Sequence, residues 1–228
     1  MYKRQEVIYA QDIDKGNLKS KYDVIIFVGG AMPPLTGGPR AVLPQPNDVP
    51  EEFRKTIGNI SKEKSIPALR AFLEEGGQVV TIGSSTSLAY HLNLPVRDAL
   101  TEIANGKERN LPNEKFYIPG SLMQVTIDKD AKAAWGMKTN GDVYFDDSPV
   151  FSINPDAQTK GTVKPIAWFA SDKTLRSGWA WGQSYLKDGV AAFSATIGKG
   201  TLLAFGPEIT FRAQTHGTFK LVFNQLYK

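Results

Sequence analysis

Apolar residues form an unbroken run at Tyr22–Gly30 (YDVIIFVGG), and this run ends in two glycines. Similar runs occupy Gln78–Gly83 and Gly200–Phe205, and the latter follows another strand-like segment at Gly189–Ile197. Runs rich in β-branched residues, without polar alternation, are typical of strands buried on both faces of a parallel sheet. The pattern therefore predicts that the three runs are neighbouring, mainly parallel central strands, with a shorter strand at Val7–Tyr9.

Helical spacing of apolar residues appears at three places. At Ser65–Glu75 they recur every three or four positions, and Gly76–Gly77 end the helix. A second helix is predicted at Ser84–Leu92, directly after a strand. The third, His216–Tyr227, gathers four apolar side chains on one face: Phe219, Val222, Phe223 and Leu226. Strands that alternate with helices predict an α/β fold with a mostly parallel sheet and helices on both faces.

The middle of the chain has a different pattern. Short strands are predicted within a β-rich segment, 95–188, at Leu122–Ile127, Asp142–Phe145, Pro149–Ile153 and Pro165–Ala170. Because no polar linker separates this segment from its surroundings, we expect one domain, 1–228, with residues 95–188 as an insertion. The Pro- and Gly-rich stretch after Gly30 predicts a long loop at a strand end.

Composition excludes several classes of protein. Of 228 residues, 41% are hydrophobic and 22% charged, which is ordinary for a globular chain. The net charge of +4 is spread along the chain rather than clustered, which argues against nucleic-acid binding. There is no cysteine, so thiol chemistry, disulfides and cysteine-ligated metals are excluded. Apolar runs are too short to predict a membrane span, and the first residues lack the apolar core of a secretion signal.

The strand-to-helix turn at Gly83–Ser87 is the first candidate for chemistry. Such a turn can expose a nucleophile beside free backbone N–H groups, which makes Ser84 or Ser85 candidates. The G-x-S-x-G pattern is incomplete, since Ser87 replaces the second glycine, and these hydroxyls would equally serve to cap a helix. The base would have to be His216, because His91 lies about 10 Å along the helix axis from Ser84. His216 would equally serve as a capping histidine.

Other ligand signals are weaker. Neither histidine begins an H-x-x-E or H-E-x-x-H pattern, so we expect no metal site and no cofactor. Asp146–Asp147 would suit a hard cation or an ordinary turn, and the pairs Gly29–Gly30 and Gly37–Gly38 match no nucleotide-binding loop. An aromatic stretch is a candidate surface for stacking on sugars or peptides, or else packs in the core: Trp168, Trp179, Trp181 and Tyr185.

Several segments together resemble a known family. They are AQDIDKGNL, YDVIIFVGGA, IPALRAFLEEGGQVVTIGSSTSLAYHL, LRSGWAWGQ and FGPEITFRAQTHGTFKLVFN. In this order they are similar to the C-terminal domain of large bacterial zinc carboxypeptidases of the carboxypeptidase A-like family. That domain has the flavodoxin-like, class I glutamine amidotransferase-like fold. The resemblance implies a zinc metallocarboxypeptidase parent that is exported, with its upstream peptidase domain as the partner of this chain.

The resemblance also implies what the site contains. The nucleophilic cysteine of amidotransferases falls at Gly83 or Ser84, the catalytic histidine at Gly206 and the glutamate at Glu208. It therefore implies a concave but vestigial pocket of Gly83, Ser84, Ser85, Gly206 and Glu208.

The roles of two charged residues follow from that pocket. We expect Glu208 to accept backbone hydrogen bonds or to pair with Arg212, so that Glu208→Gln would lose some stability. Arg212 is also a ligand-binding candidate.

The resulting expectation is a non-catalytic accessory domain that supports folding, assembly or substrate presentation. The alternatives are a serine-dependent hydrolase using Ser84 or Ser85 with His216, and a carbohydrate- or peptide-binding module built on Trp179, Trp181 and Tyr185. The family's fold begins with an additional strand and helix, so we expect the sheet to lack one flank. An open strand edge would then favour a homo-oligomer. No nucleic acid or membrane partner is expected.

Overall fold

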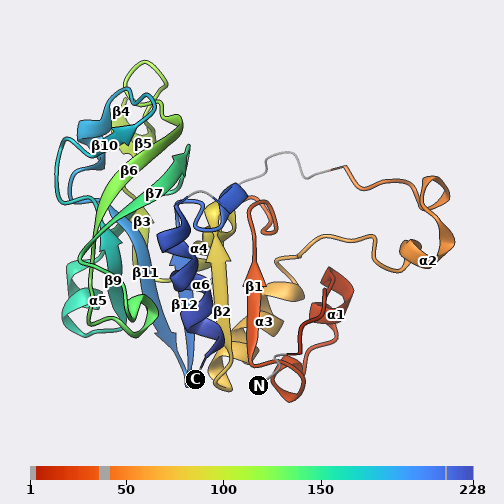
Figure 1. The fold of residues 1–228 in the computed structure, drawn as a ribbon. Helices are drawn as coiled ribbons and strands as arrows, with labels where there is room; N and C mark the ends of the chain where they lie inside the picture. Colours follow the sequence, from red (N-terminus) through yellow and green to blue (C-terminus); the bar gives the residue numbers. More distant parts are fainter. Residues whose placement is uncertain (1–3, 36–41, 214, 228) are drawn as a thin grey trace.

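The computed structural model describes residues 4–35, 42–213 and 215–227. Figure 1 shows a large sheet with helices on both of its faces. The sheet contains β1 (Val24–Phe27), β2 (Gln78–Ile82), β3 (Val96–Asp98), β6 (Pro119–Ile127), β7 (Asn140–Asp146), β8 (Phe151–Ile153), β9 (Val163–Trp168), β10 (Leu175–Ser177), β11 (Val190–Ile197) and β12 (Gly200–Phe205). A separate hairpin consists of β4 (Thr101–Ala104) and β5 (Lys107–Asn110).

The helices are short, apart from two. They are α1 (Ala10–Asp14), α2 (Glu51–Arg54), α3 (Ser65–Glu74), α4 (Leu88–His91), α5 (Pro155–Thr159) and α6 (Phe219–Leu226). Single 3-10 turns are η1 (Leu18–Ser20), η2 (Pro46–Asp48), η3 (Gly83–Ser87), η4 (Lys132–Ala134), η5 (Gln183–Leu186), η6 (Phe211–Ala213) and η7 (His216–Thr218). In the described part of the chain, no helix is long and apolar enough to cross a membrane.

The three predicted strands are neighbours. β1 is parallel to β2, with Ile25 opposite Val79, and β2 is parallel to β12, with Leu202 also opposite Val79. Along β2, side chains alternate between the two faces, so that Val79 joins one buried cluster and Val80 the other. Parallel strands with helices on both faces confirm the predicted α/β class.

The prediction that β1 is a central strand is wrong. β1 ends the sheet order, and no strand of the described residues pairs with its outer side. Ile25 and Phe27 are buried, but Ile26 is 39% exposed and Val28 is 64% exposed. The apolar run alone could not show this, because the run is the same whether or not another element covers its second face.

The predicted strand at Val7–Tyr9 is not formed either. These residues lead instead into α1, where the Asp12 carboxylate accepts a hydrogen bond from the Tyr9 N–H at 3.2 Å. Val7 is 76% exposed and has no described strand beside it. Three apolar-rich positions are too few to specify a strand without a neighbour.

Beyond β12 the sheet continues with antiparallel pairs. β11 pairs with β12 and β9, β6 pairs with β9, β7 and β10, and β8 joins β11 to β3. The four strands predicted inside 95–188 correspond to β6, β7, β8 and β9, whereas β3, β4, β5 and β10 were not predicted. Those four are short and mostly polar, so they carry little period-two signal.

Helices α3 and α6 lie on opposite faces of the sheet (Figure 1). α3 buries Leu69, Phe72 and Leu73 completely or nearly so, as its spacing predicts. On α6, by contrast, the buried residues are Leu221 and Gln225, and Phe223 is 52% exposed. The predicted apolar face of the last helix is therefore turned partly toward solvent.

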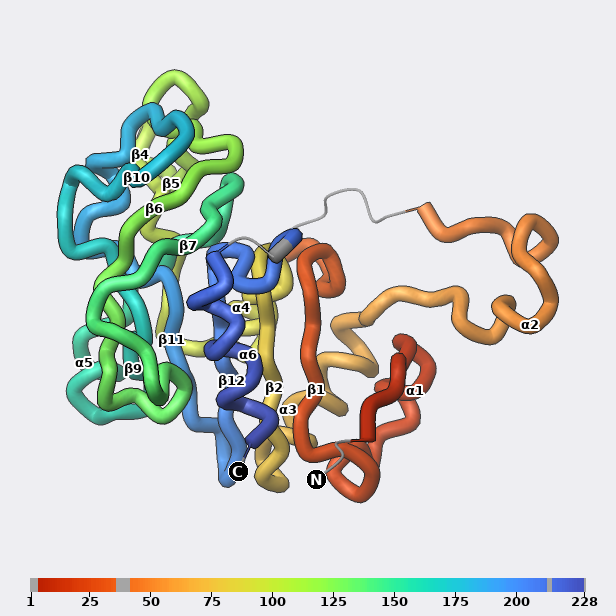
Figure 2. Tube along the Cα trace, viewed as in Figure 1, coloured from red at the N-terminus to blue at the C-terminus, as the bar shows by residue number. Residues whose placement is uncertain are grey.

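The predicted long loop after Gly30 extends far from the sheet and carries η2 and α2 (Figure 2). Its described part is exposed, with Val42 at 94% and Phe53 at 52%. The Gly37–Gly38 pair lies outside the described residues.

Candidate functional site

The loops that follow β1 and β2 are joined by two serine side chains. The Gly30 N–H donates to Oγ of Ser84 at 2.7 Å, and the Ala31 N–H donates to Oγ of Ser85 at 3.1 Å. The Ser85 hydroxyl in turn donates to the Val28 carbonyl. Ser85 is completely buried. Both hydroxyls therefore connect the turn after β2 to the end of β1.

The turn after β2 has its unusual backbone angle at Gly83, which has φ of +59°. Neither Ser84 nor Ser85 has a positive φ. In a nucleophile elbow, the reactive residue occupies the strained position of the strand-to-helix turn. The residue with the left-handed backbone in this turn is therefore Gly83, which has no side chain.

Glu208 lies directly over this glycine. The Glu208 N–H donates to the Tyr144 carbonyl at 3.1 Å, which holds the segment after β12 against β7. A Cβ atom added at Gly83 would lie 2.5 Å from Oε1 of Glu208, and one added at Gly29 would lie 3.5 Å from it. Burial, and next the nearby charge of Asp146, raise the pKa of the Glu208 carboxyl. The carboxylate thus occupies the space that a nucleophile would need.

Gly206, which the sequence resemblance aligns with the catalytic histidine, is tightly enclosed. A Cβ atom there would lie 1.9 Å from the Pro149 carbonyl oxygen and 3.2 Å from that of Ala191. Both obstacles are main-chain atoms, which cannot rotate away as a side chain can. The backbone next to the pocket therefore excludes any side chain at this position.

The expected pairing of Glu208 with Arg212 is not made. Within the described residues, the Glu208 carboxylate has no ion pair and no hydrogen bond to a backbone N–H. The Arg212 guanidinium instead lies over the Phe211 ring, 5.2 Å from its centroid, and that ring stacks on Tyr144 at 4.5 Å. Without a partner for Glu208, the reason to expect a loss of stability in Glu208→Gln disappears.

The two histidines contact groups other than the serine hydroxyls. Nε2 of His91 is 2.8 Å from the Pro33 carbonyl. His216 is exposed at the start of η7, with its ring 5.5 Å from that of Phe219. In the part of the chain that the structure describes, no hydrogen bond joins either histidine to Ser84 or Ser85.

The acidic pair Asp146–Asp147 is exposed at the end of β7, and Asp147 has φ of +41°. Burial, followed by the charge of Asp146, raises the pKa of the Asp147 carboxyl. Over residues 4–35, 42–213 and 215–227, no group of three or more His, Cys, Asp or Glu is placed to hold a metal ion.

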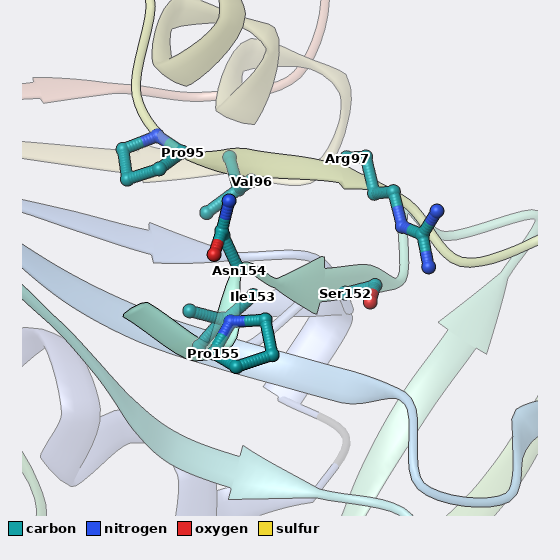
Figure 3. Close-up of a pocket in the computed structure, with 7 residues that line it drawn as sticks. All are labelled: Pro95, Val96, Arg97, Ser152, Ile153, Asn154 and Pro155. Atoms are coloured by element: carbon teal, nitrogen blue, oxygen red, sulfur yellow. The ribbon is translucent and has the colours of Figure 1, made fainter. Parts of the chain in front are cut away.

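Two cavities lie elsewhere, on the β-rich part. One of about 430 Å³ is lined by residues of the paired strands β3 and β8 and of the segments next to them: Pro95, Val96, Arg97, Ser152, Ile153, Asn154 and Pro155 (Figure 3). The other, of about 390 Å³, has Tyr185 on its wall. Trp179 and Trp181 are each 54% exposed, so the candidate aromatic residues are not core residues. Neither Tyr144 nor either cavity has a signal in the sequence, because tertiary contacts alone place them.

No family model and no curated protein matches the chain. Among solved structures, it is similar to Agd3, described as a novel carbohydrate deacetylase, with a TM-score of 0.50 and 13% identity, over 90% of this chain and 25% of that one. It is also similar to a protein assigned as a GMP synthase subunit from Thermoplasma acidophilum, with a TM-score of 0.49 and 12% identity, over 96% and 75%.

A third neighbour is the β-galactosidase from Bacillus circulans sp. alkalophilus, with a TM-score of 0.44 and 11% identity, over 71% of this chain and 20% of that one. The chain thus spans about a fifth of the length of the first β-galactosidases that it matches. PurLQS from Thermotoga maritima is a further neighbour, with a TM-score of 0.45 and 12% identity, over 72% of this chain and 69% of that one, and none of these named structures is a carboxypeptidase. At these identities the likeness is one of fold alone.

Proposed function

We propose that the chain is a non-catalytic, amidotransferase-like accessory domain of a zinc carboxypeptidase, which supports folding, assembly or substrate presentation. The observation that supports the absence of catalysis best is the enclosure of Gly206, where a Cβ atom would lie 1.9 Å from the Pro149 carbonyl oxygen. A triad needs an imidazole to activate its nucleophile. The link to a carboxypeptidase rests on the sequence resemblance.

The nucleophile position supports the same proposal. Gly83 offers no side chain, and the Glu208 carboxylate covers it. Activated nucleophiles are paired with a base at about 2.6–3.2 Å, and that base is oriented by a third group. Here the third group is present without the other two, so Glu208 has nothing to orient.

The rival proposal is hydrolysis by Ser84 or Ser85. Ser85 argues against it, because its buried hydroxyl is already bonded to Ala31 and Val28. Ser84 is exposed and accepts one hydrogen bond, from the Gly30 N–H. Ser84 is therefore the position at which this rival has to be tested.

A fluorophosphonate probe tests catalysis directly. We expect no labelling of the wild-type chain and no glutaminase or p-nitrophenyl ester hydrolysis above the uncatalysed rate. Ser84→Ala and Ser85→Ala are the matched variants. Labelling or hydrolysis that disappears in either variant would replace the proposal with the hydrolase.

The link to a zinc carboxypeptidase is tested by sequencing the gene upstream of the Met1 codon. We expect the reading frame upstream of the Met1 codon to encode a peptidase domain with an H-x-x-E motif and a downstream histidine, as zinc ligands require. A frame without such a domain would refute the carboxypeptidase assignment and leave the argument about catalysis unchanged.

A further inference from the structure

Three aromatic side chains share one face of a short antiparallel ribbon. Tyr117 and Trp181 are bridged by two backbone hydrogen bonds, of 3.1 and 3.0 Å. Directly opposite residues share a face, and so does Trp179, two positions before Trp181. The Tyr117 and Trp179 rings are in edge contact, with centroids 5.9 Å apart. We call Tyr117, Trp179 and Trp181 the aromatic platform.

The two tryptophans of the platform are exposed, Tyr117 is half-buried, and hydrogen bonds hold the platform in place. The Trp181 Nε1–H donates to the Glu114 carbonyl at 2.7 Å. Oγ of Ser121 accepts from the Trp179 N–H at 2.9 Å and donates to its carbonyl at 2.6 Å. Gly182 has φ of +73°, and a Cβ atom there would lie 2.0 Å from a backbone oxygen. Exposed rings on a fixed backbone lose little further freedom when a ligand stacks on them.

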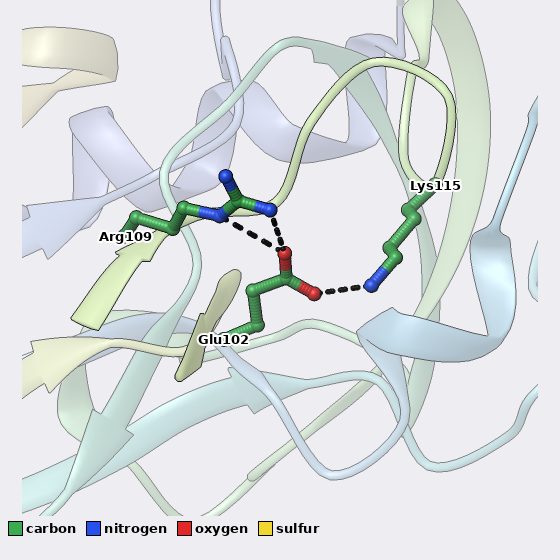
Figure 4. A network of polar contacts seen from close by, with 3 residues as sticks. All are labelled: Glu102, Arg109 and Lys115. Carbon is green, nitrogen blue, oxygen red and sulfur yellow. Dashed lines mark hydrogen bonds and ion pairs between the residues drawn. The ribbon is translucent and has the colours of Figure 1, made fainter. Parts of the chain in front are cut away.

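A polar cavity of about 390 Å³ has Tyr185 in its wall, and it is linked to the platform although no platform residue lines it. The connection runs through two consecutive residues. Glu114 accepts the Trp181 bond, and Lys115 forms an ion pair with Glu102, which lines the cavity. Figure 4 shows Glu102 between Lys115 and Arg109, and Arg109 is 2.8 Å from the other carboxylate oxygen. Platform and cavity are therefore linked through the Glu114–Lys115 segment.

The charges around the cavity are balanced. Its lining includes two basic side chains and four acidic ones: Arg97, Lys187, Asp98, Glu102, Glu108 and Asp188. Arg109 and Lys115, which pair with Glu102, bring the basic groups to four. A surface without excess positive charge does not favour a phosphate backbone. It offers closely spaced donors and acceptors next to aromatic faces.

We propose that the aromatic platform, together with the cavity linked to it through Glu114 and Lys115, binds an uncharged oligosaccharide. The apolar C–H faces of sugar rings stack on the Trp179 and Trp181 rings, and the hydroxyl groups at the ring edges exchange hydrogen bonds with the polar lining. Sites for small ligands combine aromatic walls with a few polar groups in this way. This binding does not depend on the proposed accessory function.

Calorimetric titration of the full chain with three hexasaccharides tests the proposal: cellohexaose, chitohexaose and a β-1,4-linked galactohexaose. We expect at least one to bind, and Trp179→Ala and Trp181→Ala each to raise its Kd about tenfold or more, as the loss of a stacked aromatic does in other binding sites. Trp135→Ala is the matched control, because Trp135 is 76% exposed but lies beside η4 and α6. It should leave the Kd unchanged.

Trp181→Phe separates stacking from folding. This variant keeps an aromatic face but loses the hydrogen bond to the Glu114 carbonyl, so it should bind the hexasaccharide more tightly than Trp181→Ala does. The unfolding midpoint of every variant is measured to show that it is folded. The proposal is wrong if none of the three hexasaccharides binds, or if Trp179→Ala and a folded Trp181 variant bind as well as wild type. Binding of a proline-rich peptide or a single-stranded oligonucleotide that depends on the platform, in place of the hexasaccharides, would likewise overturn it.

Discussion

Gly206→Ala is expected to destabilise the fold strongly. The added Cβ atom would lie 1.9 Å from the Pro149 carbonyl oxygen, 3.0 Å from its carbon and 3.2 Å from the Ala191 oxygen. Overpacking of this kind costs about 1–3 kcal/mol. Because every obstacle is main chain, we expect the upper end, about 3 kcal/mol, which in a chain of this size lowers the melting temperature by about 6–12 °C.

Gly29→Ala provides a matched control, because it makes the same substitution at a glycine with more open surroundings. Its Cβ atom would meet Oε1 of Glu208 at 3.5 Å and Oγ of Ser84 at 3.7 Å, which are ordinary contacts. Neither Gly29 nor Gly206 has a positive φ, so the two substitutions differ only in what the new atom meets. We expect Gly29→Ala to change the free energy of unfolding by about 0.5 kcal/mol or less.

Thermal unfolding and urea titration of the two variants measure this difference. If Gly206→Ala melts as wild type does, the Pro149 backbone does not enclose position 206. The argument that a histidine cannot be accommodated there would then be lost.

Three further results are expected. Burial, and next the Asp146 charge, raise the pKa of the Glu208 carboxyl, so the stability that its protonated form contributes is present at low pH and is lost as the pH rises through that pKa. The melting temperature of wild type minus that of Glu208→Gln should therefore fall between pH 4 and pH 7. A difference that stays constant over this range contradicts the prediction. Ser85→Ala should cost about 1–3 kcal/mol because it removes the two hydrogen bonds of a buried hydroxyl, whereas exposed Ser84→Ala removes one and should cost less. Equal costs in urea unfolding would be inconsistent with this difference. Val28→Lys, on the open edge, should change stability by about 0.5 kcal/mol or less and raise the concentration at which light scattering detects aggregates; increased aggregation would contradict the role given to this edge.

How far the fold could be predicted depends on whether the signal was local. The apolar runs at β2 and β12 and the helical spacing of α3 specify both the element and its burial, because these elements are covered on the faces that the pattern requires. The run at β1 is equally apolar, yet Ile26 and Val28 are exposed. Coverage is a property of neighbouring elements, which no single segment encodes.

In the candidate site too, some features could be predicted from local sequence, while others depend on tertiary contacts. The motif order brought Gly83 and Glu208 into one prediction, and the structure places them together. The left-handed φ of Gly83 and the enclosure of Gly206 could not be predicted, since the first depends on turn geometry and the second on a proline far away in the sequence. The pairing of Glu208 with Arg212 failed because Arg212 lies over Phe211 instead.

In the non-catalytic domain that we propose, the lack of an activated nucleophile would be part of the architecture rather than the result of a single substitution. A cysteine introduced at Gly83 would bring its Cβ atom to 2.5 Å from the Glu208 carboxylate, the flexible end of a side chain that can move. A histidine introduced at Gly206 would meet main chain that cannot move without shifting Pro149 and Ala191. Ser84 and Ser85 meanwhile use the elbow to hold the β1 loop. Restoring an activated nucleophile would thus require rebuilding the backbone around Gly206, and adding side chains alone would not achieve it.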